Sequence, residues 1–301
     1  MRSLVLSSVV CALLLAPPAH AGPRRCGDDV GGRAIPCDCG DLLVGSRTLG
    51  DDDPITSHAC PGTGLLVAVP AGHPAATLAL AGHVIAGSGR GVGVQVVGGG
   101  DGGLTIAGPG AVRGFGTGIQ GVNGTLARVA SVVAAENAAD GFFVAGAGFV
   151  LSGCEATHNG HSGFALRGRG YRLDGNRALD NGRSGFEVAG HDSVVGDTLG
   201  NEAAGNARDG ISVRGRGHDI RHAAATANGG RGINAHFADG GITGTVVSAN
   251  RRHGLRAAGG ALTVRDNEAH DNGGGIDVRG ARVRDGGGNH AEDCRVGSKC
   301  R

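Results

Sequence analysis

The segment Asn181–Val188, with the sequence NGRSGFEV, decides the fold, because close copies of it recur along the chain. The copies are NAADGFFV from Asn137, NGHSGFAL from Asn159, NARDGISV from Asn206, NGGRGINA from Asn228, NRRHGLRA from Asn250 and a shortened NGGGIDV from Asn272. Successive leading asparagines are 22 residues apart, except for one step of 25 after Asn181. The extra three residues indicate an insertion near Thr198–Gly200. A fixed period of this length predicts a solenoid.

Alternation of side chains within each copy identifies the kind of solenoid. In GFEVAG the apolar Phe186 and Val188 flank Glu187, which is the period of two that is typical of a strand. Leucine-rich repeats need an L-x-x-L-x-L run that is absent, and helical repeats need about 33 residues or more. Three apolar columns per repeat predict an all-β, right-handed parallel β-helix of about ten coils over residues 65–291.

Stacking explains why the same fragment must be repeated. Successive coils of a parallel sheet lie about 4.8 Å apart, so equivalent residues fall on one another. We expect the leading asparagines to form a ladder of side-chain amides and Phe164 to be buried between Phe142 and Phe186. The glycine four residues after each asparagine is expected to adopt a backbone conformation closed to other residues. Tyr171 falls in an apolar column and is expected in the core.

The two ends of the chain differ from the repeats. Residues 1–21 combine Arg2, an apolar run and an Ala-His-Ala end, which is the pattern of a secretory signal peptide. Residues 22–64 are rich in cysteine and predict a cap over the first coil, and residues 292–301 predict a C-terminal cap or tail. No segment is long and apolar enough to span a membrane. These features predict a secreted, extracellular or periplasmic, monomeric protein.

The cysteines suggest disulfides in such an oxidising compartment. The predicted pairs are Cys26 with Cys37, Cys39 with Cys60, and Cys294 with Cys300, whereas Cys154 is expected to remain a buried thiol. The alternative is a zinc site built from the early cysteines, but the C-x-C spacing at Cys37 is poor for a structural zinc site. We therefore expect neither a metal nor a cofactor.

Charge patterning points to one candidate surface. The net charge of +1 argues against a nucleic-acid partner. Strand alternation sends several charged columns to solvent on neighbouring coils, where arginines could pair with the carboxylates or sulfates of a polysaccharide. The same charges are explained at least as simply by a solvated face that keeps the sheet from associating. The candidate binding residues are His158, His161, Arg167, Arg183, Glu187, Arg208 and Arg214.

The repeat N-x-x-x-(S/D)-G-F-x-V resembles the right-handed parallel β-helix repeat family of the pectate-lyase-like superfamily, especially its secreted bacterial members. The stretches LDNGRSGFEV (179–188) and AHDNGG (269–274) are also similar to coils of mannuronan C5-epimerases. The superfamily's catalytic motifs are absent: the one Asp-Pro, Asp53-Pro54, continues with Ile55 rather than His-Glu. The resemblance therefore implies a non-catalytic scaffold or a binder of anionic polysaccharide. The alternative it implies is a polysaccharide lyase or C5-epimerase acting on uronate polymers.

Overall fold

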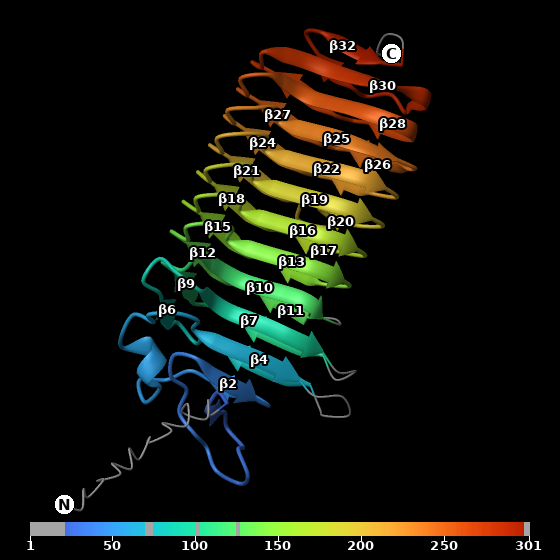
Figure 1. Cartoon of the computed structure of the whole chain (residues 1–301). Coiled ribbons are helices and arrows are strands. Elements are labelled where there is room, and N and C mark those ends of the chain that lie inside the picture. The colour runs from blue at the N-terminus through green and yellow to red at the C-terminus, as the bar shows by residue number, and fades with distance from the viewer. Residues whose placement is uncertain (1–21, 70–74, 100–102, 125–126, 298–301) are drawn as a thin grey trace, which may run out of the picture.

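The computed structural model describes residues 22–69, 75–99, 103–124 and 127–297. Its strands wind into a parallel solenoid with the N-terminal region at one end and the last coils at the other (Figure 1). Every pairing between named strands is parallel and joins each strand to its counterpart on the next coil, as in the pairs of Phe164 with Phe142 and with Phe186. The predicted all-β parallel solenoid is thus confirmed. The predicted signal peptide lies outside the described residues.

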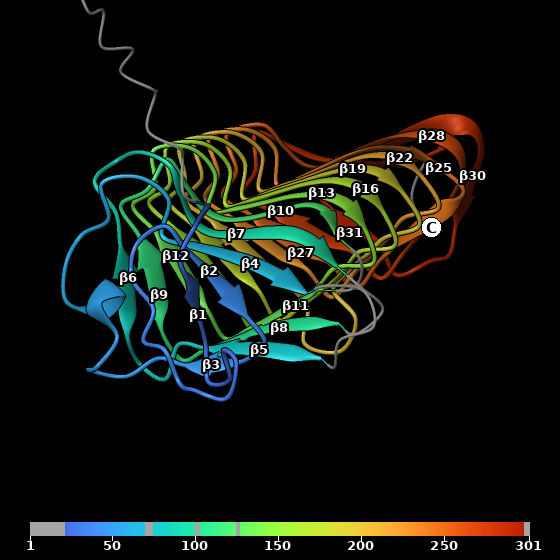
Figure 2. The ribbon, with the colours of Figure 1, turned by 60° about the horizontal axis from the view of Figure 1, so that its bottom comes forward.

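Three faces surround the core when the solenoid is viewed from its capped end (Figure 2). The first face contains β1 (Arg25–Cys26), β2 (Asp41–Val44), β4 (Leu65–Val69), β7 (Val92–Gly99), β10 (Thr117–Gly124), β13 (Phe142–Ala147), β16 (Phe164–Arg169), β19 (Phe186–His191), β22 (Ile211–Arg216), β25 (Ile233–Ala238), the first parts of β28 (His253–Arg265) and β30 (Gly274–Asp285), and β32 (Cys294–Val296). The second face contains β3 (Arg47–Thr48), β5 (Ala76–Ala79), β8 (Leu104–Ala107), β11 (Ala127–Ala130), β14 (Val150–Ser152), β17 (Arg172–Asp174), β20 (Val194–Val195), β23 (Asp219–Arg221), β26 (Gly240–Thr243) and the later parts of β28 and β30. Because β28 and β30 continue around the corner, these two faces form one sheet.

The third face is a separate sheet of ten strands, one for each coil from residue 84 onward. It contains β6 (Val84–Ala86), β9 (Ala111–Arg113), β12 (Val133–Ala135), β15 (Glu155–Thr157), β18 (Arg177–Leu179), β21 (Glu202–Ala204), β24 (Ala224–Thr226), β27 (Val246–Ser248), β29 (Glu268–His270) and β31 (His290–Ala291). One short helix, η1 (Pro54–Thr56), lies near the N-terminal end. No helix in the described part of the chain has the length and apolar character to cross a membrane.

Stacked identical side chains fill the core as the repeat predicts. Phe164 is fully buried, and its ring is stacked at 4.7 Å between centroids on both Phe142 and Phe186. In the asparagine ladder, Asn159 Nδ2 donates to Asn181 Oδ1 at 3.0 Å and to the backbone carbonyl of Ala134 at 3.0 Å. From Asn137 to Asn250 each amide therefore ties its turn both to the next coil and to the strand beneath it, and among the described residues no ladder amide is left unsatisfied in the interior.

The glycines that follow the ladder correct one expectation. Gly141, Gly163 and Gly185 have ordinary backbone conformations rather than left-handed ones. They are required by close packing instead, because a Cβ on Gly163 would lie 2.9 Å from both Asn181 Nδ2 and the carbonyl oxygen of Gly185. The left-handed positions fall one residue before each ladder asparagine, as at His158 (φ 54°) and Asp180 (φ 51°).

The disulfides agree with the predicted cap. Cys26 is bonded to Cys37 and Cys39 to Cys60, as predicted. Cys294 is also disulfide-bonded, but its predicted partner Cys300 lies outside the described residues, so that pairing stays a prediction. Cys154 is a buried free thiol, and burial raises its pKa to about 11. Such a thiol is protonated and unreactive near neutral pH.

Candidate functional site

The turn that leads into the first face carries the charged column closest to the ladder. Two residues after the five ladder asparagines from Asn159 to Asn250 stand His161, Arg183, Arg208, Gly230 and Arg252, which we call the arginine row. Their backbones are stacked directly, with each N–H donating to the carbonyl of the row member one coil earlier at 2.7–3.0 Å. The buried ladder fixes the turn, so the row is held in register while the side chains of Arg183, Arg208 and Arg252 remain exposed.

A second pair of predicted arginines lies on the same face, near the middle of its strands. Arg167 on β16 and Arg214 on β22 are in register through Ala189, two coils apart. Arg167 lies over the ring of Phe143, 5.7 Å from its centroid, and Arg214 lies 3.7 Å from Glu187. The row lies three residues before each strand and this column three residues into it, so an extended chain would separate the two by about 20 Å. The structure therefore places the predicted residues in two groups on one face.

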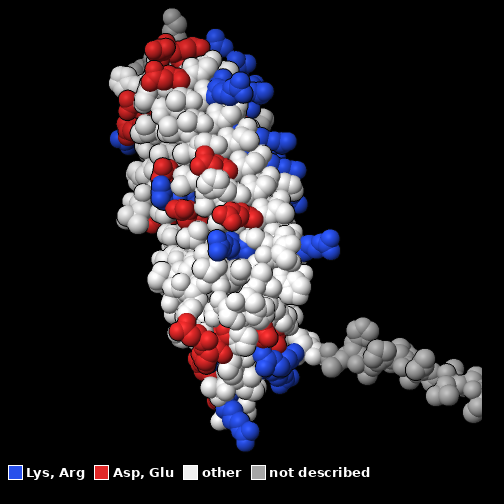
Figure 3. Space-filling model, turned by 90° about the vertical axis from the view of Figure 1, so that its left-hand side faces the viewer, with Lys and Arg blue, Asp and Glu red and all other residues white. Residues whose placement is uncertain are grey.

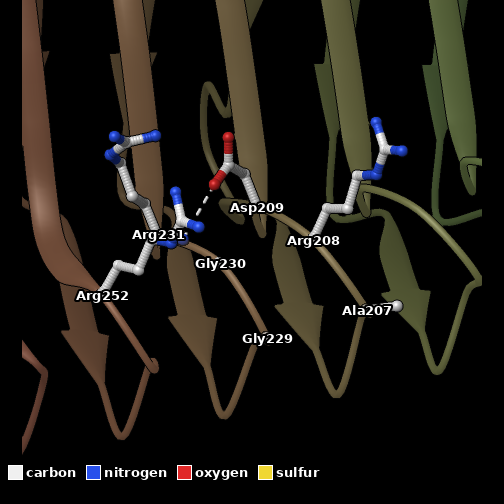
Figure 4. Close-up of a pocket in the computed structure, with 7 residues that line it drawn as sticks. All are labelled: Ala207, Arg208, Asp209, Gly229, Gly230, Arg231 and Arg252. Atoms are coloured by element: carbon white, nitrogen blue, oxygen red, sulfur yellow. Dashed lines mark hydrogen bonds between the residues drawn. The ribbon is translucent and has the colours of Figure 1, made fainter.

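A hollow interrupts the arginine row at Gly230. Its volume is about 260 Å³, and it is lined by Arg208, Arg231 and Arg252 together with Asp209 and the backbone of Gly229 and Gly230. Figure 4 shows Arg208 on one side of Asp209 and the side chains of Arg231 and Arg252 on the other. Any larger residue at position 230 would be strained, because its Cβ would lie 2.5 Å from Asp209 Oδ1 and 2.7 Å from the backbone carbon of Arg208.

The electrostatics of the hollow favour an anion. Asp209 is the one carboxylate in the lining, and both of its oxygens are engaged, by the Arg231 N–H at 2.8 Å and by Asn234 Nδ2 at 2.7 Å. Three guanidinium groups against one carboxylate leave a formal charge of +2. The Arg231 Nε is buried without a hydrogen-bond partner. A buried donor of this kind is costly to leave unpaired, so it would gain from an acceptor supplied by a ligand.

The arginines of this region differ in their pairing from several arginines elsewhere. Arg177 on the third face contacts Glu202 at 2.9 Å and Glu155 at 3.1 Å, and Arg221 contacts Asp219 at 2.7 Å. By contrast, within the described ranges no carboxylate forms an ion pair with the guanidinium groups of Arg183, Arg208, Arg231 or Arg252. Cationic side chains also follow one edge of the molecule in Figure 3. Arg183, Arg208, Arg231 and Arg252 therefore present positive charge that no ion pair among the described residues compensates.

The column one residue before the packing glycines is the (S/D) position of the repeat, but the sequence did not single it out as part of a site. It contains Asp140, Ser162, Ser184, Asp209 and Arg231, which recur at the repeat period; Ser162 and Ser184 are buried. Burial raises the pKa of Asp140, although the Ser162 N–H that it accepts at 2.9 Å acts in the opposite direction. Ser162 also donates weakly to Glu187 at 3.4 Å. This column therefore joins a partly buried carboxylate to Glu187 through a serine.

The remaining candidate residues contribute less to this site. His158 is exposed at the left-handed turn position, and its Nδ1 lies 2.8 Å from Thr157 Oγ1. In the N-terminal region Asp38, Cys39 and His58 bring potential metal ligands within 4.8 Å of one another, but the Cys39 sulfur is bonded to Cys60. A second hollow of about 350 Å³ lies beside the insertion, where Arg177 and Glu202 already pair. We therefore place the candidate site at the arginine row.

The fold and this exposed face define a β-helix repeat protein, and comparison with known proteins gives the family. The model of the right-handed β-helix region matches residues 93–243 and 162–300, so the chain belongs to this family. No curated protein matches the chain.

Three solved structures illustrate how distant the structural likeness is. The A-module of a mannuronan C-5 epimerase from Azotobacter vinelandii is 14% identical, with 84% of this chain and 90% of that chain covered and a TM-score of 0.39. A pectate lyase is 14% identical over 90% of this chain and 79% of its own, with a TM-score of 0.43. A periplasmic alginate epimerase is 14% identical over 83% and 86%, with a TM-score of 0.42. The likeness is too remote to carry an activity over to this chain.

Proposed function

We propose that this chain is a secreted β-helix protein that binds an anionic polysaccharide along the arginine row. The observation that carries the proposal is the set of four arginines, Arg183, Arg208, Arg231 and Arg252, that stand on consecutive coils without carboxylate partners. Guanidinium groups pair with carboxylate and sulfate oxygens in a fixed fork, and a regular spacing suits a regularly charged polymer. Two disulfides at the N-terminal end support an oxidising compartment and hence secretion.

The binding experiment compares polymers that differ in charge. Isothermal titration calorimetry at low salt should detect binding of polygalacturonate or dextran sulfate and no binding of neutral dextran. Affinity should fall steeply with added salt, because exposed charges are screened within about 10 Å at 0.1 M ionic strength. The double variant Arg183→Gln/Arg208→Gln should bind the charged polymer about three- to tenfold more weakly. A wild-type protein that binds no charged polymer would refute the proposal.

A matched control separates this site from general surface charge. The exposed Arg251 lies beside Arg252 in sequence but does not line the hollow, so Arg251→Gln removes one positive charge from the same turn. This variant should retain nearly the wild-type affinity. Equal losses in Arg251→Gln and in Arg252→Gln would mean that net charge, rather than the arginine row, accounts for the binding.

A second candidate function is a lyase or epimerase that acts on uronate polymers, and one observation favours it. Burial raises the pKa of the Asp140 carboxyl. The charge of Glu187 raises this pKa further, whereas His161 and Arg183 act to lower it. A carboxyl group with a raised pKa is better suited to proton transfer near neutral pH than an ordinary one. Incubation with polygalacturonate and alginate tests this candidate. Ultraviolet absorbance would report unsaturated lyase products, and proton NMR would report epimerised residues; both should disappear in Asp140→Asn.

A further inference from the structure

We infer that the hollow at Gly230 binds a tetrahedral ester oxyanion, a sulfate or phosphate group carried by a polysaccharide, in preference to a planar carboxylate. This inference rests on the proposed function, because it names the anionic group that the arginine row holds. It concerns a site defined by Arg208, Arg231 and Arg252, of which the sequence columns had singled out Arg208 as a binding residue.

The first argument is the placement of the cations around the hollow. Arg208, Arg231 and Arg252 belong to three successive coils, so their backbones are separated by steps of about 4.8 Å along the solenoid axis. Arg208 lies on one side of Asp209, and Arg231 and Arg252 lie on the other (Figure 4). A carboxylate offers two coplanar oxygens and is satisfied by a single guanidinium fork. An ester oxyanion offers three oxygens in different directions and can accept hydrogen bonds from arginines on several sides.

The second argument concerns the volume and the formal charge of the hollow. The hollow of about 260 Å³ equals the liquid volume of roughly nine waters at about 30 Å³ each, which admits an oxyanion and part of the sugar that carries it. Its floor is backbone, since positions 229 and 230 are glycines. The two Asp209 carboxylate oxygens already accept hydrogen bonds from the backbone N–H of Arg231 and from the side-chain amide of Asn234. The formal charge of +2 suits a phosphate monoester, which carries nearly two negative charges near neutral pH, more than a carboxylate or a sulfate ester, which carry one each.

The third argument is the unpartnered donor. Arg231 is half-buried and its Nε has no hydrogen-bond partner, whereas the Asp209 carboxylate is satisfied by other groups. The side chain of Arg231 lines the hollow, and its Nε lies buried behind that lining without an acceptor. An oxyanion in the hollow would supply an acceptor if the Arg231 side chain turned its Nε toward it. Charge-assisted hydrogen bonds of this kind are about twice as strong as neutral ones.

The test uses polymers with one backbone and different charged groups. Dextran sulfate, dextran phosphate, carboxymethyl dextran of matched charge density and neutral dextran are titrated into the wild-type protein. We expect at least one ester polymer to bind about tenfold more tightly than carboxymethyl dextran. The tighter of the two ester polymers identifies the oxyanion as sulfate or phosphate. Arg231→Gln and Arg252→Gln should each abolish the preference, because each should weaken binding of the ester polymer more than binding of carboxymethyl dextran, and Arg251→Gln should keep the preference.

The outcomes separate this inference from the proposed function. Equal affinity for ester and carboxymethyl polymers, or a preference that survives Arg231→Gln, overturns the inference and leaves the polysaccharide proposal standing. Inorganic sulfate and phosphate are titrated in parallel with acetate. If no polymer binds but inorganic sulfate or phosphate binds saturably and is lost in Arg231→Gln, the oxyanion hollow is supported and the polysaccharide proposal fails. If neither polymer nor inorganic anion binds, both fail.

Discussion

The asparagine ladder and the arginine row lie two residues apart on the same turns, yet they behave in opposite ways. The ladder is buried and nearly invariant from coil to coil, because each amide must bond the next one. The row is largely exposed and reads His161, Arg183, Arg208, Gly230, Arg252, with no such constraint. This difference indicates that the interior columns determine the solenoid fold, whereas the exterior columns can vary and can bind a ligand. Substitutions should therefore affect stability in one row and ligand affinity in the other.

The largest loss of stability is expected deep in the interior. Phe164→Ala removes the middle ring of a three-ring stack with centroids 4.7 Å apart. The cavity and the lost burial should lower the free energy of unfolding by about 3–5 kcal/mol. Chemical denaturation of the variant and of the wild type measures this difference. A variant that unfolds at the wild-type denaturant concentration would contradict the stacking of the core.

A smaller loss is expected in the ladder itself. Asn181→Ala deletes the amide that donates to the Ala156 carbonyl at 3.0 Å and accepts the Asn159 N–H at 3.1 Å. The buried groups left without partners should cost about 1–3 kcal/mol. Asn181→Asp is a useful companion, because it keeps the acceptor oxygen and removes the donor. An unchanged midpoint in both variants would show that the ladder does not contribute to stability.

The pH dependence of stability tests a buried histidine behind the first face. His218 is fully buried, its Nδ1 accepts the Ser193 N–H at 3.3 Å, and its Nε2 lies 3.1 Å from the Gly190 carbonyl. Burial lowers its pKa below the ordinary 6.5, with Asp192 and His191 acting nearby in opposite directions. A depressed histidine pKa contributes stability above about pH 6.5 that is lost as the pH falls.

A tyrosine two coils earlier in the same column, with Ser193 between it and His218, supplies the matched variant. Tyr171 Oη donates to the carbonyls of Gly146 and Arg167, in the same manner as His218 reaches Gly190 and Arg214. His218→Tyr should therefore keep the contacts and flatten the dependence of the melting temperature on pH between about 7 and 5. Thermal melts across this range measure the slope, and an undiminished slope would mean that other groups titrate instead.

The smallest effect is expected at the insertion. Leu199 is 79% exposed, and the backbone of its loop is held by Asp174, which accepts the N–H groups of residues 197, 198 and 199. Leu199→Ser should change the free energy of unfolding by no more than about 0.5 kcal/mol. Asp174→Asn should lower the free energy of unfolding by more than Leu199→Ser does. The backbone N–H donors stabilise the charged Asp174 carboxylate and lower its pKa, although burial acts in the opposite direction. Denaturation of both variants tests this order.

Much of the fold was predictable, because residues that are 22 positions apart in the sequence become neighbours on adjacent coils. Spacing alone placed Phe164 between Phe142 and Phe186 and joined the asparagines. It did not reveal why Gly163 must be glycine, since the approach of the Asn181 amide depends on the path of the turn. The wrong expectation of a left-handed glycine came from treating conformational freedom as its only role.

The candidate site was less predictable than the fold. The arginine row was visible as a column, and Arg183 and Arg208 were singled out from it. Arg231 was missed because it stands one residue nearer the strand than the row, and only the hollow at Gly230 brings it together with Arg208 and Arg252. The separation of the arginine row from Arg167 and Arg214 was also not predicted. It became clear only when the strands were located, because the number of residues along an extended chain then gives a distance.

One paired measurement tests the central claim most directly. Asn181→Ala and Arg183→Gln are made separately, and both the free energy of unfolding and the dissociation constant for a charged polymer are measured at low salt. The account predicts that Asn181→Ala loses about 1–3 kcal/mol of stability and keeps its affinity while folded. Arg183→Gln should keep its stability within about 0.5 kcal/mol and bind more weakly. Loss of affinity in the ladder variant with none in the arginine variant would contradict the division between interior and exterior columns.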